Sequence, residues 1–140
     1  MVEIKKILVA YDTSEPADRA FETGVDLAQK YSAELIVLSV ARPPEPPEMV
    51  EAEAALDSAK DHYEQRFVKL REMATAAGVT PRFEVRVGHP AEQIIHMANE
   101  ENANVIIMGH RGKSRISRWL LGSISKRVIS YAHCSVCIVR

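Results

Sequence analysis

The last quarter of the chain combines glycines with basic residues in the segment GHRGKSRISRWLLGS, residues 109–123. Gly109 and Gly112 are three positions apart, and Gly122-Ser123 follows after nine more residues. A phosphate group needs backbone N–H donors at close approach, and glycine permits this because it has no Cβ atom. A helix N-terminus nearby would add a positive dipole. The segment therefore predicts a site for a phosphorylated ligand.

The distribution of charge favours an anion at the same place. The whole chain has a net charge of −1, which argues against general attraction to nucleic acid or to an anionic membrane. Residues 109–140 contain no Asp or Glu and seven basic residues: Arg111, Lys113, Arg115, Arg118, Lys126, Arg127 and Arg140. The alternative is a basic surface that serves only solubility. We expect instead that this segment faces an anion.

Two common phosphate-binding motifs do not fit the segment. Gly112-Lys113-Ser114 is similar to the end of a P-loop, but that motif requires glycine where this chain has Ile107. The dinucleotide pattern G-x-G-x-x-G is absent from the sequence. The glycines therefore indicate a phosphate site of another type.

Length and composition indicate one domain, residues 1–140. Of the 140 residues, 46% are hydrophobic and 26% are charged, which is typical of a globular protein. No apolar run approaches the roughly 20 residues that span a bilayer, and the start MVEIKKILVAYD has no signal-peptide layout. Two cysteines are too few for a disulfide framework. We expect a soluble cytoplasmic protein that binds neither a membrane nor nucleic acid.

Strand and helix patterns alternate along the chain. Apolar or alternating runs predict strands at residues 4–11, 35–41, 80–87, 105–108 and 136–139. Helical spacing predicts helices at residues 15–31, 52–77, 91–98 and 119–131. This order is typical of an open parallel sheet with helices on both faces. Ligands bind such sheets beyond the carboxyl ends of the strands, so we expect a site formed by residues 12–14 and 109–117.

Several local features sharpen this interpretation. Ser14 is the expected N-cap of the first helix, and Tyr31 is expected on its buried face. The segment 80–87 alternates apolar and charged residues, as on an edge strand with one wet face. His89 and His110 fall in predicted loops and are expected to be solvated.

The two cysteines are expected to be structural. Cys134 and Cys137 lie where a helix ends and a strand begins, rather than at the helix N-terminus that lowers a thiol pKa. Because they are three residues apart on a strand, they are expected on opposite faces of the sheet.

Four blocks of the chain resemble the universal stress protein family, in its ATP-binding branch. In chain order they are ILVAYDTS at 7–14, GHPAEQI at 88–94, the spacing Gly109-x2-Gly112-x9-Gly122-Ser123, and AHCSVCIV at 132–139. Three positions depart from the usual family pattern: Ala10 and Ser135 where proline is frequent, and Asn104 where aspartate is common.

The resemblance implies an open five-stranded parallel sheet of order 3-2-1-4-5, of the adenine-nucleotide alpha-hydrolase-like type. It implies a homodimer through the last strand, Ser135 to Val139. It also implies ATP as the ligand, with AMP or ADP as alternatives, and Mg or Mn held through the phosphates rather than by protein ligands.

Carried over by position, the resemblance assigns roles within an ATP site. Asp12 would hydrogen-bond the adenine end, although it also suits a simple helix start. Val40 would line the adenine pocket, the segment 109–115 would surround ribose and phosphates, and Ser123 with Ser125 would bond phosphate oxygens. The complete set is Ala10, Tyr11, Asp12, Val40, Met108, Gly109, His110, Arg111, Gly112, Lys113, Ser114, Arg115, Gly122, Ser123, Ile124 and Ser125.

Three functions fit these residues. The first is a homodimeric ATP-binding stress or regulatory module. The second is a slow ATPase or phosphotransfer enzyme, and the third is a nucleotide-free dimerisation protein. Hydrolysis usually needs a carboxylate that holds a metal, and Asp12 is the obvious candidate because residues 109–140 contain none. We therefore favour binding over turnover and assign no catalytic residue; the signal and any protein partner stay unspecified.

Overall fold

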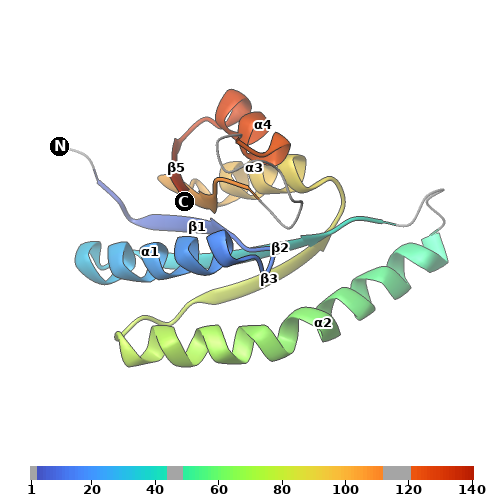
Figure 1. Ribbon diagram of the computed structural model, residues 1–140, viewed down its shortest axis with the longest axis horizontal. Coiled ribbons are helices and arrows are strands. Elements are labelled where there is room, and N and C mark those ends of the chain that lie inside the picture. Colours follow the sequence, from blue (N-terminus) through green and yellow to red (C-terminus); the bar gives the residue numbers. More distant parts are fainter. Residues whose placement is uncertain (1–2, 44–48, 112–120) are drawn as a thin grey trace.

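The computed structural model describes residues 3–43, 49–111 and 121–140, in which strands and helices alternate (Figure 1). The elements in chain order are β1 (Lys6–Ala10), α1 (Glu15–Tyr31), β2 (Glu34–Ala41), α2 (Met49–Ala76), β3 (Arg82–Val87), α3 (Pro90–Glu101), β4 (Val105–Gly109), α4 (Ser123–Tyr131) and β5 (Ser135–Val139). The predicted alternation of strands and helices is confirmed.

The five strands form one parallel sheet in the order β3-β2-β1-β4-β5, as expected. β1 lies at the centre, where Ile7 pairs with Leu35 of β2 on one side and with Val105 of β4 on the other. The strand order reverses at β1, so the carboxyl ends of β1 and β4 flank the point where open α/β sheets bind ligands.

Helices cover both faces of the sheet, and each face has its own hydrophobic core. Ile7 and Val9 of β1 pack toward α1 and α2, while Leu8 between them packs toward α3 and α4. Figure 1 shows these two pairs of helices on opposite sides of the strands. This alternation explains why the central strands are apolar throughout: both of their faces are buried.

Helix α1 has the predicted start but a different end. The Ser14 hydroxyl accepts a hydrogen bond from the Ala17 N–H at 3.2 Å, which confirms it as the N-cap. Tyr31 is 52% exposed, so its expected burial is wrong. The buried face ends at Ala28, because the chain turns away at Ser32 in a left-handed conformation.

Helix α4 begins at Ser123, whereas the sequence pattern placed the helix start at residue 119. Residues 121 and 122 are not helical, and the remainder of the predicted start lies outside the described residues. Gly122 has extended backbone angles, and its N–H donates to the His110 carbonyl at 2.8 Å. This long-range bond holds Gly122 at the end of β4 and sets the start of the helix.

The two edge strands differ in their protection. On β3, the charged face that was expected to be wet is partly covered by α3: Arg86 pairs with Glu100 at 3.1 Å, and Arg82 pairs with Glu101. β5 lies at the other edge, and Cys134 just before it and Cys137 within it are free thiols. Cys137 packs against the core on the α1 side and Cys134 against the core on the α3 side, which confirms their opposite placement.

Within the part of the chain that the structure describes, none of the helices has the length and apolar character required to cross a membrane.

Close packing of α1 on β1 depends on Gly24. A Cβ atom at this position would lie 2.6 Å from Val9 Cγ2 and 3.3 Å from Leu35 Cδ1. We expect Gly24→Ala to lower the free energy of unfolding by about 1 kcal/mol, because overpacking the core outweighs the gain in helix propensity. Urea unfolding measures this change. Glu22→Ala, at an exposed site on the same helix, should stay within about 0.5 kcal/mol of the wild type. A more stable Gly24→Ala variant would contradict the close contact.

Candidate nucleotide site

A cavity of about 350 Å³ opens beyond the carboxyl ends of β1, β2 and β4. This volume lies within the usual range of about 300–1,000 Å³ for small-molecule sites. The described residues that line it are Ala10, Tyr11, Asp12, Ser14, Ala17, Leu38, Val40, Arg42, Tyr63, Pro90, Ile94, Met108, Gly109, Arg111, Gly122, Ser123, Ile124 and Ser125. The loops after β1 and β4 therefore meet at one site, as the strand order requires.

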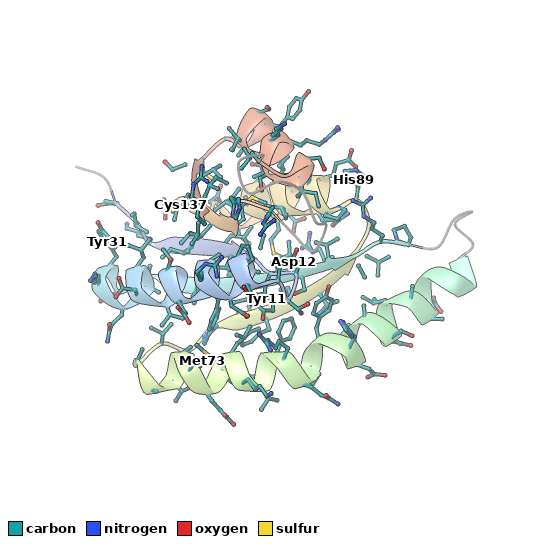
Figure 2. All side chains as sticks on the ribbon, in the orientation of Figure 1. Tyr11, Asp12, Tyr31, Met73, His89 and Cys137 are labelled. Carbon is teal, nitrogen blue, oxygen red and sulfur yellow. The ribbon has the colours of Figure 1, made fainter. Side chains whose placement is uncertain are left out.

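The loop after β1 presents a carboxylate to the cavity. Asp12 Oδ1 accepts hydrogen bonds from the Ser14 N–H at 3.0 Å and from the Ser14 hydroxyl. Between them, Thr13 has a φ of 69°, a left-handed conformation that is rare for a β-branched residue. The turn thus orients Asp12 and starts α1 at the same time (Figure 2).

The opposite wall is built from the end of β4 and the start of α4. Ser123, Ile124 and Ser125 form the first turn of α4 and line the cavity. The N-cap Gly122 has no side chain to bond the first N–H groups of the helix, so within the described part of the chain these groups can serve a ligand. Together with Arg111, this helix start can bind an anion.

Two hydrogen bonds and one close contact fix this wall to the sheet. The Gly122 N–H donates to the His110 carbonyl at 2.8 Å, and the Ser125 hydroxyl donates to the Gly109 carbonyl at 3.0 Å. A Cβ atom at Gly109 would lie 2.6 Å from Pro16 Cβ. Glycine at this position is therefore required by the packing of α1 and not only by the approach of a ligand.

Most of the site residues predicted from the sequence come together around the cavity. These are Ala10, Tyr11, Asp12, Val40, Met108, Gly109, Arg111, Gly122, Ser123, Ile124 and Ser125. Gly112, Lys113, Ser114 and Arg115 lie outside the described residues. His110 is not one of the residues that line the cavity.

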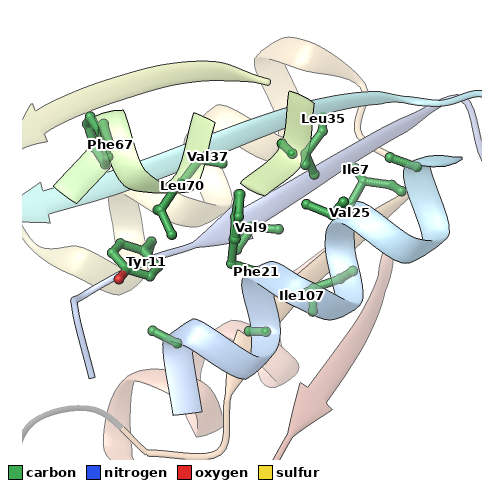
Figure 3. Close-up of a cluster of buried hydrophobic side chains, with 14 of the residues drawn as sticks. Ile7, Val9, Tyr11, Phe21, Val25, Leu35, Val37, Phe67, Leu70 and Ile107 are labelled. Atoms are coloured by element: carbon green, nitrogen blue, oxygen red, sulfur yellow. The ribbon is translucent and has the colours of Figure 1, made fainter. Parts of the chain in front are cut away.

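Tyr11 lines the cavity, and its side chain also belongs to the hydrophobic core (Figure 3). Its hydroxyl donates to Asp18 Oδ1 at 2.5 Å and accepts from Arg66 Nε at 2.8 Å, while Arg66 also pairs with Asp18 at 2.7 Å. Burial, followed by the hydrogen bond to Asp18, raises the pKa of the Tyr11 phenol. This network joins β1, α1 and α2 directly behind Asp12.

His110 is buried, and the expectation of a solvated imidazole is wrong. The residue is 7% exposed. Its backbone N–H donates to the Val139 carbonyl at 2.8 Å, which holds the residue against β5. The imidazole Nδ1 atom has no hydrogen-bond partner among the described residues. Burial lowers the pKa of the imidazole, and the nearby Arg111, Arg140 and Arg19 lower it further.

Several lining residues were not predicted as site residues from the sequence, among them Leu38, Arg42, Tyr63, Pro90 and Ile94. Tyr63 belongs to the apolar stripe of α2, and such a stripe predicts only burial. Its place at the cavity follows from how α2 packs on the sheet, which no local signal reveals.

Among residues 3–43, 49–111 and 121–140, no group of three or more His, Cys, Asp or Glu side chains is positioned to hold a metal ion.

An open parallel sheet with a cavity at its strand reversal defines an α/β ligand-binding domain. A sequence model of the universal stress protein family matches residues 3–140. A universal stress protein of Thermus aquaticus is 36% identical over 138 residues, which cover 97% of this chain and 98% of that protein. The chain therefore belongs to the universal stress protein family.

Solved structures agree with this assignment. The universal stress protein UspA of Lactobacillus plantarum superposes with a TM-score of 0.89 over 100% of both chains, at 24% identity, which supports the adenine-nucleotide alpha-hydrolase-like fold. A universal stress protein in complex with cAMP gives a TM-score of 0.75 at 26% identity and covers 97% of each chain.

The left-handed turn at Thr13 gives a test of the Asp12 loop. At an ordinary loop position, a protein with glycine is less stable than the same protein with alanine by about 0.5–1 kcal/mol. At Thr13 we expect the reverse, with Thr13→Gly more stable than Thr13→Ala by up to about 1 kcal/mol, because only glycine adopts this conformation without strain. Thr80, which precedes a proline and is not left-handed, provides the matched pair of control variants. If the alanine variant were more stable than the glycine variant at both positions, the left-handed conformation of Thr13 would be contradicted.

Burial of His110 gives a test by pH. Its pKa is lowered in the folded state, so the unfolded chain binds more protons between the folded pKa and the unfolded value of about 6.5. The contribution of His110 is therefore fully present above about pH 6.5 and is lost as pH falls below it. Urea unfolding at several pH values should show that the free energy of unfolding falls less with decreasing pH for His110→Gln than for the wild type. The exposed His89→Gln should follow the wild type; an unchanged profile for His110→Gln would refute the role of this imidazole.

Proposed function

We propose that this protein binds ATP, with the phosphates at the start of α4 and the nucleoside toward Asp12. The observation that carries the proposal is the cavity at the strand reversal, with an uncapped helix start and Arg111 on one wall and a carboxylate on the other. This polarity suits a ligand with an anionic end and a hydrogen-bond-donating end.

The space between the two polar walls suits an adenine ring. Ala10, Leu38, Val40, Ile94 and Met108 supply apolar side chains to the cavity. A planar base buries apolar area against such a surface and leaves its polar edge for a few placed groups. The related protein that was solved with cAMP supports an adenine nucleotide as the ligand class.

Nucleotide binding is proposed ahead of turnover. Among the described lining residues, the carboxylate comes from Asp12 alone, and its Oδ1 is already held by Ser14. Phosphoryl transfer usually relies on carboxylates that hold Mg²⁺ and on a group that orients the nucleophile. In our proposal Mg²⁺ or Mn²⁺ accompanies the nucleotide through its phosphates.

Two further elements complete the proposal. A homodimer would form by pairing of two β5 strands, because β5 is an apolar edge strand that pairs with β4 alone among the described strands. A closed twofold arrangement would satisfy both edges at once. The cytoplasm is the proposed location, since it supplies ATP.

Isothermal titration calorimetry with ATP and Mg²⁺ tests the phosphate end of the site. Ser123 is exposed at the first position of α4, where an acidic residue normally stabilises the helix. We expect Ser123→Asp to fold and to weaken ATP binding by about tenfold or more, because its carboxylate repels the phosphates. Ser123→Asn, of the same size and uncharged, should bind nearly as the wild type does.

Each alternative function has its own signature in these measurements. Equal affinity of Ser123→Asp and wild type would place the phosphates elsewhere. The absence of any heat with ATP, ADP or AMP would favour a nucleotide-free dimer. Sustained hydrolysis near about 1 s⁻¹, the lower end for phosphotransfer enzymes, would establish an enzyme instead.

A further inference from the structure

Tyr63 reaches the cavity from α2, a helix that otherwise serves the hydrophobic core. The residue is 7% exposed and lines the cavity together with Asp12. Its ring stacks on Phe67, with centroids 5.8 Å apart and an angle of 16° between the planes. Phe67 in turn packs on Phe83 of β3 at 4.6 Å. The Tyr63 ring is thus supported by Phe67, which is itself supported by Phe83.

The Tyr63 hydroxyl has no hydrogen bond to another residue in the described part of the chain. Among the described residues, His110 Nδ1 is the buried side-chain polar atom without a partner, so the unpaired Tyr63 hydroxyl is not sealed from solvent. Tyr11 differs, since its hydroxyl is bonded to both Asp18 and Arg66. The contrast between these two buried tyrosines points to a partner for Tyr63 inside the cavity.

The electrostatic surroundings keep the Tyr63 phenol protonated. Burial raises its pKa, and the negative charge of Asp12 raises it further. Asp12 therefore lies within electrostatic reach of the phenol. An ionised Asp12 can only accept hydrogen bonds, whereas a neutral phenol can both donate and accept. The two groups together offer complementary hydrogen-bonding capacity on one wall.

We propose that Tyr63 is a ligand-contacting residue whose hydroxyl hydrogen-bonds the nucleoside part of the bound nucleotide beside Asp12. This inference rests on the proposed function and adds α2 to the site. The group that Tyr63 contacts is a hydrogen-bond acceptor of the nucleoside, either a ribose hydroxyl oxygen or a ring nitrogen of the base. Its role is to select nucleotides that present such an acceptor next to a donor for Asp12.

The placement of α2 makes this contact rigid. Arg66 lies one helical turn after Tyr63 and is tied to Asp18 and to the Tyr11 hydroxyl. Tyr11 directly precedes Asp12 in the chain. The same turn of α2 therefore holds Tyr63 at the cavity and braces the strand end that carries Asp12.

Tyr63→Phe tests the hydroxyl while it keeps the stacked ring. Calorimetry with ATP and Mg²⁺ should show affinity weakened by about 2- to 12-fold, the range for one neutral hydrogen bond. Unfolding of the ligand-free protein should show no loss of stability, since the hydroxyl has no described protein partner. Tyr31→Phe removes an exposed hydroxyl from another helix and should change neither measurement.

Binding of 2′-deoxy-ATP locates the contact. If the partner is the ribose 2′-hydroxyl, the difference between wild type and Tyr63→Phe should vanish with this ligand; if the partner lies elsewhere on the nucleoside, the difference should persist. Wild-type affinity of Tyr63→Phe for ATP would overturn the inference, as would weaker binding accompanied by a less stable fold. A wild type that binds no nucleotide would overturn the proposed function as well, so the two failures are distinguishable.

Discussion

The central position of β1 is the constraint on which the site depends. β1 pairs with β2 on one side and with β4 on the other, so its carboxyl end opens where the strand order reverses. No helix that connects neighbouring strands can cover this point from both sides, and a cavity remains there. Asp12 lies two residues after the end of β1 and is therefore delivered to the cavity by topology, while the tight turn at Thr13 sets its orientation.

The wall opposite Asp12 is held by a short series of long-range hydrogen bonds. His110 receives the Gly122 N–H at its carbonyl and donates its own N–H to Val139, while Ser125 bonds to Gly109. The ends of β4 and β5 and the start of α4 are thereby joined. The start of α4 and the edge strand β5 are therefore both hydrogen-bonded to the backbone of His110. The imidazole of the same residue is buried, and this burial lowers its pKa.

Two tyrosines of similar burial differ in how their hydroxyls are bonded. Tyr11 and Tyr63 are both nearly inaccessible, and both belong to the core between the sheet and α2. The hydroxyl of Tyr11 is satisfied within the protein, where it joins three elements through Asp18 and Arg66. Tyr63 lines the cavity, and its hydroxyl lacks such a partner among the described residues. Hydrogen-bond satisfaction, rather than exposure, is what differs between the two residues.

The sequence by itself determined the order of strands and helices, the cap at Ser14 and the gathering of the loops after β1 and β4. These features follow from periodicity, capping and strand polarity, which act over a few residues or follow from topology. The tertiary structure alone decided the burial of His110, the contact between Gly109 and Pro16, the start of α4 at Ser123 and the place of Tyr63 in the cavity wall. Each of these depends on atoms that are distant in the chain and meet only when helices pack on the sheet, and no local pattern records such meetings.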